Sequence, residues 1–477
     1  MTNSVYRFRP TDALLDGFHE LKNQEIYFAR PSELNDPLEG YKDLSWKGDE
    51  IAWRNLLRHY LLCLMQAVLQ ALEHGADYQV TSETLPVGMV DEDLQPEVRK
   101  VFDTLCAGFF ADPELALLPG LLAEQSSRMF RNEMLSLLLP IHSRIFTLVC
   151  TTLQPDQPIN AIDARFRKSG KRPLRLKESF AALEALHLKH ADSADIVEVI
   201  TSKMVSAVEQ TTFILTYNDA NQQGDAAWRI VASAFPEIYL NALEKLLYFD
   251  WYTACFVAEP TQAAMWSQYG DGHRGVCLEF KTSALPSGAP AITLRHLVGM
   301  RGTRENVTPA YEFGPLQLYE VRYEDRFKEI EFFRSLGNLT QRQLAFWFRG
   351  VDGIRGTTGT DLLQETDEWR RAYWESFHNA VTTKLKDWQH EREYRITLQS
   401  DADLCDPPSR KLKYRFDDLR GIIFGMKTST DHKIAIARMI HDKCKETGRT
   451  DFAIYQAYYS RRTGRVETAP WDLVNLT

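Results

Sequence analysis

The sequence has no cysteine pair and no long uncharged apolar run. Its seven cysteines are scattered over 477 residues without a C-x-x-C motif, which is typical of reduced thiols in a cytosolic protein and argues against a structural zinc site. The most apolar segments, residues 56–72 and 134–153, are interrupted by polar and charged side chains. Neither segment therefore supplies the roughly 18 uncharged residues of a membrane span. With no signal peptide predicted at the N-terminus, we expect a cytoplasmic protein that does not bind membranes.

Several sequence templates for catalysis are also missing. The glycines at residues 270–275 do not form a G-x-G-x-x-G or Walker loop, and there is no G-x-S-x-G or H-E-x-x-H motif. These absences argue against a kinase, a dinucleotide-binding fold, a serine hydrolase and a zinc protease. No metal site is predicted.

The composition is that of a globular protein with an acidic balance. Hydrophobic residues make up 44% and charged residues 25% of the chain, and the length suggests two to four domain-sized units at roughly 150 residues each. Lys and Arg number 56 against 65 Asp and Glu, which gives a net charge of −9. Because such a chain repels nucleic acid at long range, any nucleic-acid binding requires a local basic patch.

The predicted elements divide the chain into an interrupted core and an insertion. Residues 1–48 read as strand 5–9, helix 12–22 and strand 26–30, and residues 49–249 keep the apolar spacing of successive helices. Strands are then predicted at 253–257, 275–280, 316–323, 391–399, 421–425 and 451–458, with helices at 260–269, 326–349, 361–389 and 431–447. We therefore predict an α+β fold in which a small mixed or antiparallel sheet core (1–48 and 250–477) is interrupted by an all-helical insertion (49–249).

Charged residues gather near the predicted strand 391–399. Alternation along a strand places Glu391, Glu393 and Arg395 on one face, and adjacent carboxylates on one face require a compensating cation or a function. Pairing of Arg395 with Glu393 on a solvated face is one interpretation. The other uses Arg7 and Arg9 of the opening strand, which would face the carboxylates in an ion-pair network or in a site for a phosphate-bearing ligand.

Residues 265–280 (MWSQYGDGHRGVCLEF) read as a helix end, a turn and a strand. Trp266 and Tyr269 share a helix face, where paired aromatic rings form core or stack on a ligand. His273, beside the glycine-rich turn, either contacts substrate or is simply exposed.

A basic stretch lies inside the predicted helical insertion. Residues 165–177 (RFRKSGKRPLRLK) contain seven basic residues and no acidic one. This stretch is either a nucleic-acid or acidic-partner contact or a solvated loop between helices. The candidate nucleic-acid contacts are Arg165, Arg167, Lys168, Lys171 and Arg172.

Taken together, these segments resemble a family of bacterial and phage proteins, domain-of-unknown-function family twenty-nine seventy-one. The resemblance rests on Tyr6-Arg7-Phe8, residues 26–39 (IYFARPSELNDPLE), residues 265–280, residues 386–395 (KDWQHEREYR) and residues 421–425 (GIIFG). The L-N-D-P-x-E and W-x-x-E-x-E-Y-R elements are its most specific parts. The helical block lies outside the resemblance.

The family pattern is similar to an ADP-ribosyltransferase fold of the minimal nucleic-acid-modifying and toxin kinds. This similarity implies that Arg7 contacts NAD, that Glu393 is the catalytic glutamate and that Glu391 influences the choice of acceptor. Tyr269 or Tyr27 would stack on nicotinamide. The chain departs from the pattern because it lacks a clear S-x-S on a middle strand.

The sequence thus favours an ADP-ribosyltransferase-like bacterial effector or toxin, with a role in antiphage defence as one interpretation. It would transfer ADP-ribose from NAD, its substrate, to a nucleic-acid or protein acceptor, under control of an antitoxin or regulatory partner. Two alternatives stay open: a non-catalytic sensor or binding module of a defence or toxin–antitoxin system, and a nucleic-acid-binding protein.

Overall fold

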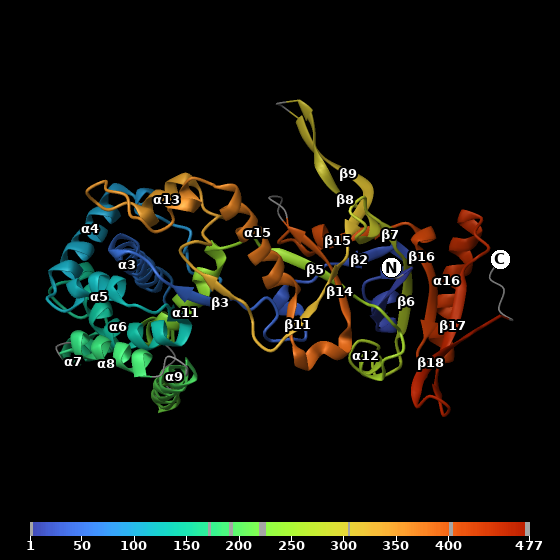
Figure 1. Ribbon diagram of the computed structural model, residues 1–477, viewed down its shortest axis with the longest axis horizontal. Helices are drawn as coiled ribbons and strands as arrows, with labels where there is room; N and C mark the ends of the chain where they lie inside the picture. Colours follow the sequence, from blue (N-terminus) through green and yellow to red (C-terminus); the bar gives the residue numbers. More distant parts are fainter. Residues whose placement is uncertain are drawn as a thin grey trace. The chain divides into compact units, whose positions relative to one another are not determined.

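The chain folds into two compact units of mixed α/β structure. The computed structural model describes residues 3–169, 173–189, 194–218, 226–303, 306–399 and 404–472 (Figure 1). The first unit comprises Met1–Tyr41, Asp250–Phe327 and His378–Thr477, and the second comprises Lys42–Phe249 and Lys328–Phe377. Residues 328–377, which the sequence analysis placed in the core, therefore group with the helical unit.

An eight-stranded sheet, here called the large sheet, forms the centre of the first unit. In spatial order its strands are β10 (Tyr319–Glu320), β14 (Glu393–Gln399), β5 (Trp251–Val257), β1 (Ser4–Arg9), β6 (Val276–Lys281), β16 (Leu419–Phe424), β17 (Ala453–Ser460) and β18 (Arg465–Pro470). Neighbouring strands are antiparallel except for the parallel pair β16–β17. The first strand of the chain thus lies in the interior of the sheet, between β5 and β6.

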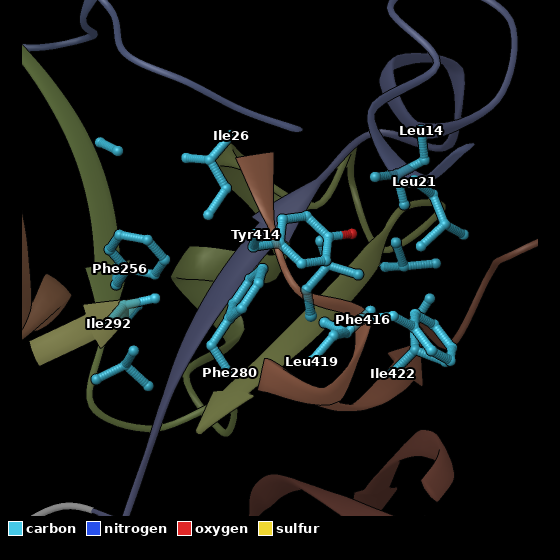
Figure 2. Packing of buried hydrophobic residues seen from close by; sticks show 14 of the residues in the cluster. Leu14, Leu21, Ile26, Phe256, Phe280, Ile292, Tyr414, Phe416, Leu419 and Ile422 are labelled. Carbon is cyan, nitrogen blue, oxygen red and sulfur yellow. The ribbon is translucent and has the colours of Figure 1, made fainter. Parts of the chain in front are cut away.

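A second sheet packs against the large one. It contains β2 (Glu25–Tyr27), β15 (Lys411–Tyr414), β8 (Pro290–Thr303) and β7 (Ser283–Ala284), and β9 (Asn306–Gln317) pairs with β8. Apolar side chains from both sheets meet in one core, where Phe256 and Phe280 lie near Ile26, Ile292 and Tyr414 (Figure 2). One face of α16 (Thr430–Thr447) joins this core. The β8–β9 hairpin, which extends beyond the sheet as a two-stranded ribbon (Figure 1), is absent from the sequence prediction.

Shorter elements complete the first unit. They are α1 (Thr11–Leu14), α2 (Glu20–Asn23), η1 (Pro31–Glu33), α12 (Ala263–Gln268), β11 (Arg322–Glu324), β13 (Thr383–Leu385), η6 (Lys386–Glu391), η7 (Pro407–Arg410) and η8 (Phe416–Asp418). The single helix predicted at 12–22 is wrong: the backbone of Gly17 bonds back to Asp12, and His19 takes a left-handed conformation (φ 51°) that separates α1 from α2.

The second unit is mostly helical. Its helices are α3 (Glu50–His74), α4 (Pro96–Ala111), α5 (Leu118–Glu124), α6 (Arg131–Leu153), α7 (Ala161–Ser169), α8 (Leu176–Lys189), α9 (Ala194–Asn218), α10 (Ala226–Ser233), α11 (Phe235–Leu243), α13 (Gln341–Phe348) and α14 (Thr360–Leu363), with short turns η2 (Gly75–Asp77), η3 (Asp91–Asp93), η4 (Leu115–Leu117) and η5 (Glu244–Leu246). A small sheet of order β12 (Glu329–Glu331), β3 (Asp43–Trp46) and β4 (Met129–Phe130) joins them. In the sequence, the division between the units after Phe377 falls within the helix α15 (Asp367–Thr382).

Two predicted helices of the C-terminal part are wrong in extent. Residues 326–349 contain strand β12, a turn and only then α13, because β12 pairs in parallel with β3. The helix predicted at 361–389 ends at Thr382, since the next three residues form β13 and pair with β11.

One unbroken helix in the described part of the chain, α6, is long and apolar enough to cross a bilayer, with a hydropathy of 1.5. The helices α4 and α5 pass the same test only as a pair, and they are bent by 90°. Half of the apolar stretch of α6 is buried inside the protein, including Leu138, Ile141 and Ile145. A central helix of a globular unit has this composition as well.

Two buried histidines link helices of the second unit. His59 of α3 contacts the Tyr239 hydroxyl through Nδ1 (2.9 Å) and a backbone carbonyl through Nε2 (2.8 Å). His142 of α6 contacts the Tyr60 hydroxyl through Nδ1 (2.8 Å) and another carbonyl through Nε2 (2.8 Å). Because a carbonyl only accepts, Nε2–H donates in both cases, and Nδ1 of the neutral ring accepts from the tyrosine.

We expect this unit to lose stability in mild acid. Burial lowers the pKa of His59 and His142 from 6.5 to about 4. As the pH falls below 6.5 the unfolded chain binds protons first, so stability present above pH 6.5 is lost between pH 6.5 and 4, by up to about 3 kcal/mol per histidine. Urea unfolding followed by the helical circular dichroism signal at pH 7.5 and 4.5 measures the loss. The loss should shrink in His59→Gln and persist in His74→Gln, a control at the exposed end of α3; an equal loss in both variants would contradict the prediction.

Candidate functional site

A cavity of about 290 Å³ opens in the large sheet where β5 changes its neighbour. β5 pairs with β1 at Val257, whereas at Thr253 both backbone hydrogen bonds go to Ala29, just after β2. One edge of β5 thus pairs with β1 at Val257 and with the segment after β2 at Thr253. We call the place where these two partners diverge the fork. We call this cavity the candidate pocket. Its lining includes Arg7, Arg9, Tyr27, Tyr269, Lys384, Glu391 and Glu393.

Five charged side chains form a buried network beside the candidate pocket. We call Glu39, Lys384, Glu391, Glu393 and Arg395 the buried charge network; none of these side chains is more than 5% exposed. Three carboxylates face two cations, so the network carries a formal charge of −1. Buried charges are tolerated only when they are paired and hydrogen-bonded, and every member of this network has such a partner.

Arg395 holds two of the carboxylates. Its guanidinium donates to Glu393 through Nε (2.8 Å) and Nη2 (3.1 Å), and to Glu39 through Nη1 (2.5 Å) and Nη2 (2.7 Å). Burial alone would raise the pKa of Glu393, but the charges of Arg395 and Lys384 outweigh it and hold the pKa well below its ordinary value. Glu393 is therefore ionised at neutral pH. The pairing of Arg395 with Glu393, one of the two interpretations of the sequence, is present, but it is buried rather than solvated.

Lys384 connects the remaining members. Its ammonium lies 2.7 Å from Glu391 Oε2, 2.9 Å from Glu393 Oε2 and 3.7 Å from Glu39 Oε2. Burial opposes its charge, but the neighbouring glutamates raise the pKa of Lys384 above its ordinary value. The Tyr269 hydroxyl donates to Glu391 Oε1 (2.6 Å), and burial with the Glu391 charge raises the pKa of Tyr269 as well. Lys384 therefore stays protonated and Tyr269 stays a neutral donor.

Glu391 reaches this position by a route that differs from the prediction. It is the last residue of η6 and not part of β14, which begins at Glu393. Arg392 between them takes a left-handed conformation with φ 47°, which breaks the strand alternation. The two carboxylates nevertheless converge, because both contact the same Lys384 ammonium.

Arg7 lines the candidate pocket from β1, which lies on the other side of β5 from Glu393 and β14. Its guanidinium donates to the carbonyl oxygens of Cys255 (3.4 Å) and Tyr27 (3.1 Å), and its buried Nε has no hydrogen-bond partner among the described residues. No carboxylate of a described residue lies within 4 Å of it to form an ion pair. Burial and the nearby charge of Arg9 lower the pKa of Arg7 to about 10. A buried cation without a counter-ion at the wall of a cavity is suited to bind an anionic group.

The other predicted contacts are placed differently. Arg9 lines the candidate pocket but is paired with Glu20, to which its Nε donates at 2.8 Å. The Tyr27 hydroxyl donates to Glu33 at 3.0 Å. Both residues can therefore shape the pocket, while the charge of Arg9 is already balanced.

His273 does not line the candidate pocket. It lies in the turn after α12, where its ring stacks on Trp266 with 6.1 Å between centroids and its carbonyl accepts from the backbone of Lys427 (2.8 Å). A Cβ atom on Gly425 would lie 2.3 Å from that carbonyl oxygen, so the turn requires glycine there. His273 thus has a structural place beside the pocket wall.

The basic stretch 165–177 belongs to the second unit. Arg167 is engaged within that unit: it pairs with Asp163 (2.9 Å) and donates to the carbonyl of Gln154 (2.8 Å) beyond the end of α6. Arg165 and Lys168 lie at the surface, and Lys171 and Arg172 lie outside the described residues. In residues 3–169, 173–189, 194–218, 226–303, 306–399 and 404–472 no group of three or more His, Cys, Asp or Glu side chains is arranged to hold a metal ion.

The two most specific elements of the predicted resemblance meet in the buried charge network, because Glu39 ends L-N-D-P-x-E and Glu391, Glu393 and Arg395 belong to W-x-x-E-x-E-Y-R.

Residues 265–396 match the family described as protein of unknown function (DUF2971). This segment belongs to DUF2971. The match contains Tyr269 and four members of the buried charge network, namely Lys384, Glu391, Glu393 and Arg395. Arg7 and Glu39 lie outside it. No curated protein and no solved structure matches the chain. The family resemblance is thus confirmed, and the similarity to ADP-ribosyltransferases stays a prediction.

Two members of the network were missed from the sequence. Lys384 stands alone in a segment predicted to be helical, and nothing in its spacing indicates that it faces carboxylates seven and nine residues later. The sequence marks Glu39 only as part of a motif. The signal that could indicate Glu39 is its position at the end of L-N-D-P-x-E, the other specific element of the resemblance.

Proposed function

We propose that the first unit is an ADP-ribosyltransferase-like catalytic unit that uses NAD as substrate in the candidate pocket. The observation that carries this proposal is the composition of the pocket wall, in which the unpaired guanidinium of Arg7 stands on one side and Glu391, Glu393 and Tyr269 stand on another. The reaction has two requirements. One is a cation that binds the diphosphate, and the other is a set of fixed carboxylates that stabilise a developing positive charge.

The chemistry follows from those charges. When the bond between nicotinamide and C1′ of the ribose breaks, its electron pair leaves with the nicotinamide nitrogen and positive charge develops on the ribose. An ionised carboxylate fixed in a pocket of low polarity stabilises that charge without reorganising. An acceptor nucleophile then bonds to C1′ and releases its proton. In this proposal Glu391, which accepts from Tyr269 and Lys384, receives this proton, and Glu393 is the carboxylate that stabilises the charge and orients the ribose.

Arginine is suited to the diphosphate because its planar guanidinium binds phosphate oxygens in a fork. We expect Arg7→Met to weaken NAD binding by about 10- to 150-fold, the equivalent of one lost hydrogen-bonded charge. Isothermal titration calorimetry measures the change. Arg449→Met is the matched control, since Arg449 is also buried and also donates to backbone carbonyls, but at Phe416 and Leu419 away from the pocket. Equal affinity of Arg7→Met and wild type would contradict this role.

The direct test of the function uses NAD labelled in its adenylate part and a bacterial lysate. Release of nicotinamide and transfer of label to macromolecules are both expected with the wild-type protein. Folded protein that neither consumes NAD nor transfers label would contradict the proposal.

A second candidate, a non-catalytic binding module, is favoured by one observation: every carboxylate of the network is engaged in an ion pair. The same experiment separates the two, because a binding module would bind NAD or another anion at Arg7 without releasing nicotinamide.

A further inference from the structure

The second sheet has one face in the core and another face at the surface. Ile26, Leu412, Tyr414, Ile292 and Leu294 point into the core. Because side chains alternate along each strand, the residues between them lie on the opposite face. Polar side chains are usual on a solvated sheet face, and here the charged ones are mainly of one sign.

The strand register orders these outer residues into rows. In one row Lys413 lies opposite Glu25 on β2 and opposite Arg295 on β8, and Arg295 lies opposite Phe313 on β9. In the next row Lys411 lies opposite Tyr27, and Tyr311 lies opposite Leu297. We call the surface formed by these rows and Arg415 the basic face.

The cations of the basic face form no close ion pairs, although Glu25 lies opposite Lys413 and the charge of Arg415 acts on Asp418. Arg295, Lys411, Lys413 and Arg415 form no ion pair with any described residue, and Arg295, Lys413 and Arg415 are exposed. Other surface arginines of this acidic chain, such as Arg301 and Arg334, are paired with carboxylates. The basic face is therefore a local positive surface on a protein of net charge −9.

Aromatic rings lie among these cations. Tyr311 is 46% and Phe313 is 39% exposed. The Arg295 guanidinium lies over the Tyr311 ring at 5.3 Å, and that of Arg415 over the Phe313 ring at 4.7 Å. Planar groups next to unpaired cations suit a polymer of stacked bases and phosphates; an acidic peptide would use the cations and leave the rings unused.

The basic face leads toward the candidate pocket. A cavity of about 350 Å³ is lined by Glu25, Tyr27 and Lys411 of the face. Arg9, Tyr27 and Glu33 line both this cavity and the candidate pocket. A polymer of bases and phosphates bound across β9, β8 and β15 would therefore reach the fork, where Arg7 and Glu393 line the candidate pocket.

We propose that the basic face binds single-stranded nucleic acid and presents one of its nucleotides to the candidate pocket as the acceptor of ADP-ribose. This inference rests on the proposed function for the acceptor role, but not for binding. A single strand is specified because bases can stack on exposed rings only when they are not already stacked in a duplex.

Binding is tested by fluorescence anisotropy with labelled oligo(dT) and oligo(U). The double variant Arg295→Glu/Lys413→Glu should weaken binding at least about tenfold and lower the salt slope by about 1.4 or more, since each phosphate contact contributes about 0.7. Phe313→Ala should weaken binding by about 5- to 150-fold through lost stacking; its ring is partly exposed, so the variant should fold. Arg461→Glu/Arg465→Glu, with two exposed cations at the opposite end of the large sheet, is the matched control and should bind normally.

The outcomes separate the two proposals. Loss of oligonucleotide binding and of label transfer to oligonucleotide, with nicotinamide release retained in Arg295→Glu/Lys413→Glu, supports the inference. Oligonucleotide binding by a wild type that never consumes NAD supports the binding surface and removes the proposed function. The inference is overturned if no oligonucleotide binds, if the basic-face variants bind as wild type does, or if poly-glutamate competes as well as oligo(dT).

Discussion

Replacing Lys384 by methionine is expected to cost the first unit about 3–5 kcal/mol of unfolding free energy. The ammonium is the contact shared by Glu39, Glu391 and Glu393, and without it Arg395 alone faces three buried carboxylates. Methionine has a similar shape, so little of the loss comes from packing. The penalty is that of uncompensated buried negative charge, which the protein can relieve only by protonating a glutamate.

Urea unfolding of wild type and Lys384→Met at pH 7 measures this cost. Lys386→Met is the matched control, because Lys386 is half-exposed and pairs with the exposed Asp325; surface pairs contribute about 0–1 kcal/mol. Removing one carboxylate together with the lysine, in Lys384→Met/Glu391→Gln, should restore part of the lost stability, since the two residues are in contact. Equal stability of the two single lysine variants would show that the network does not hold the unit together.

The second large effect is expected on turnover. Glu393→Gln should lower the rate of nicotinamide release by about 10²–10³, the size of effect seen when one electrostatic stabiliser of a transition state is removed. Glutamine keeps the shape and can still accept from Arg395. It also leaves two carboxylates facing two cations in the network, so the fold should tolerate it better than Lys384→Met.

Steady-state kinetics with NAD at saturating concentration isolates this effect, because kcat should fall while NAD affinity changes little. Glu279→Gln is the matched control: Glu279 is a buried glutamate of the same sheet, bonded to Ser4 and outside the candidate pocket. A Glu393→Gln variant that turns over NAD as fast as wild type would remove Glu393 from the mechanism.

The large sheet was largely predictable because its strands are short apolar runs bounded by breakers. The predicted strands at 253–257, 275–280 and 421–425 overlap β5, β6 and β16 closely. The β8–β9 ribbon was not predictable in the same way. Its glycines and prolines, including Gly299 and Pro309, read as breakers, and both faces of its outer part are exposed, so no apolar alternation marks it.

The sequence predicts several residues of the candidate site, but it does not predict which side chains they contact. Arg7, Tyr269, Glu391 and Glu393 all line one cavity, as the sequence interpretation requires. Side-chain spacing along one segment cannot show which distant segments supply the partners. Lys384 and Glu39 are contributed by a short strand and a loop whose positions depend on the fold of the whole unit, and Arg392 breaks the alternation by a left-handed backbone that no local rule requires of arginine.

The interior position of β1 has a consequence for the time course of folding. This strand is synthesised well before its neighbours β5 and β6, which follow all the helices from α3 to α11. At about 5–20 residues per second, β1 waits roughly 10–50 s for a partner, with Val5 and Phe8 still uncovered. Such non-local pairing also slows folding after synthesis. Arg7 is thus synthesised long before the pocket that it lines can close, because the pocket also requires β14.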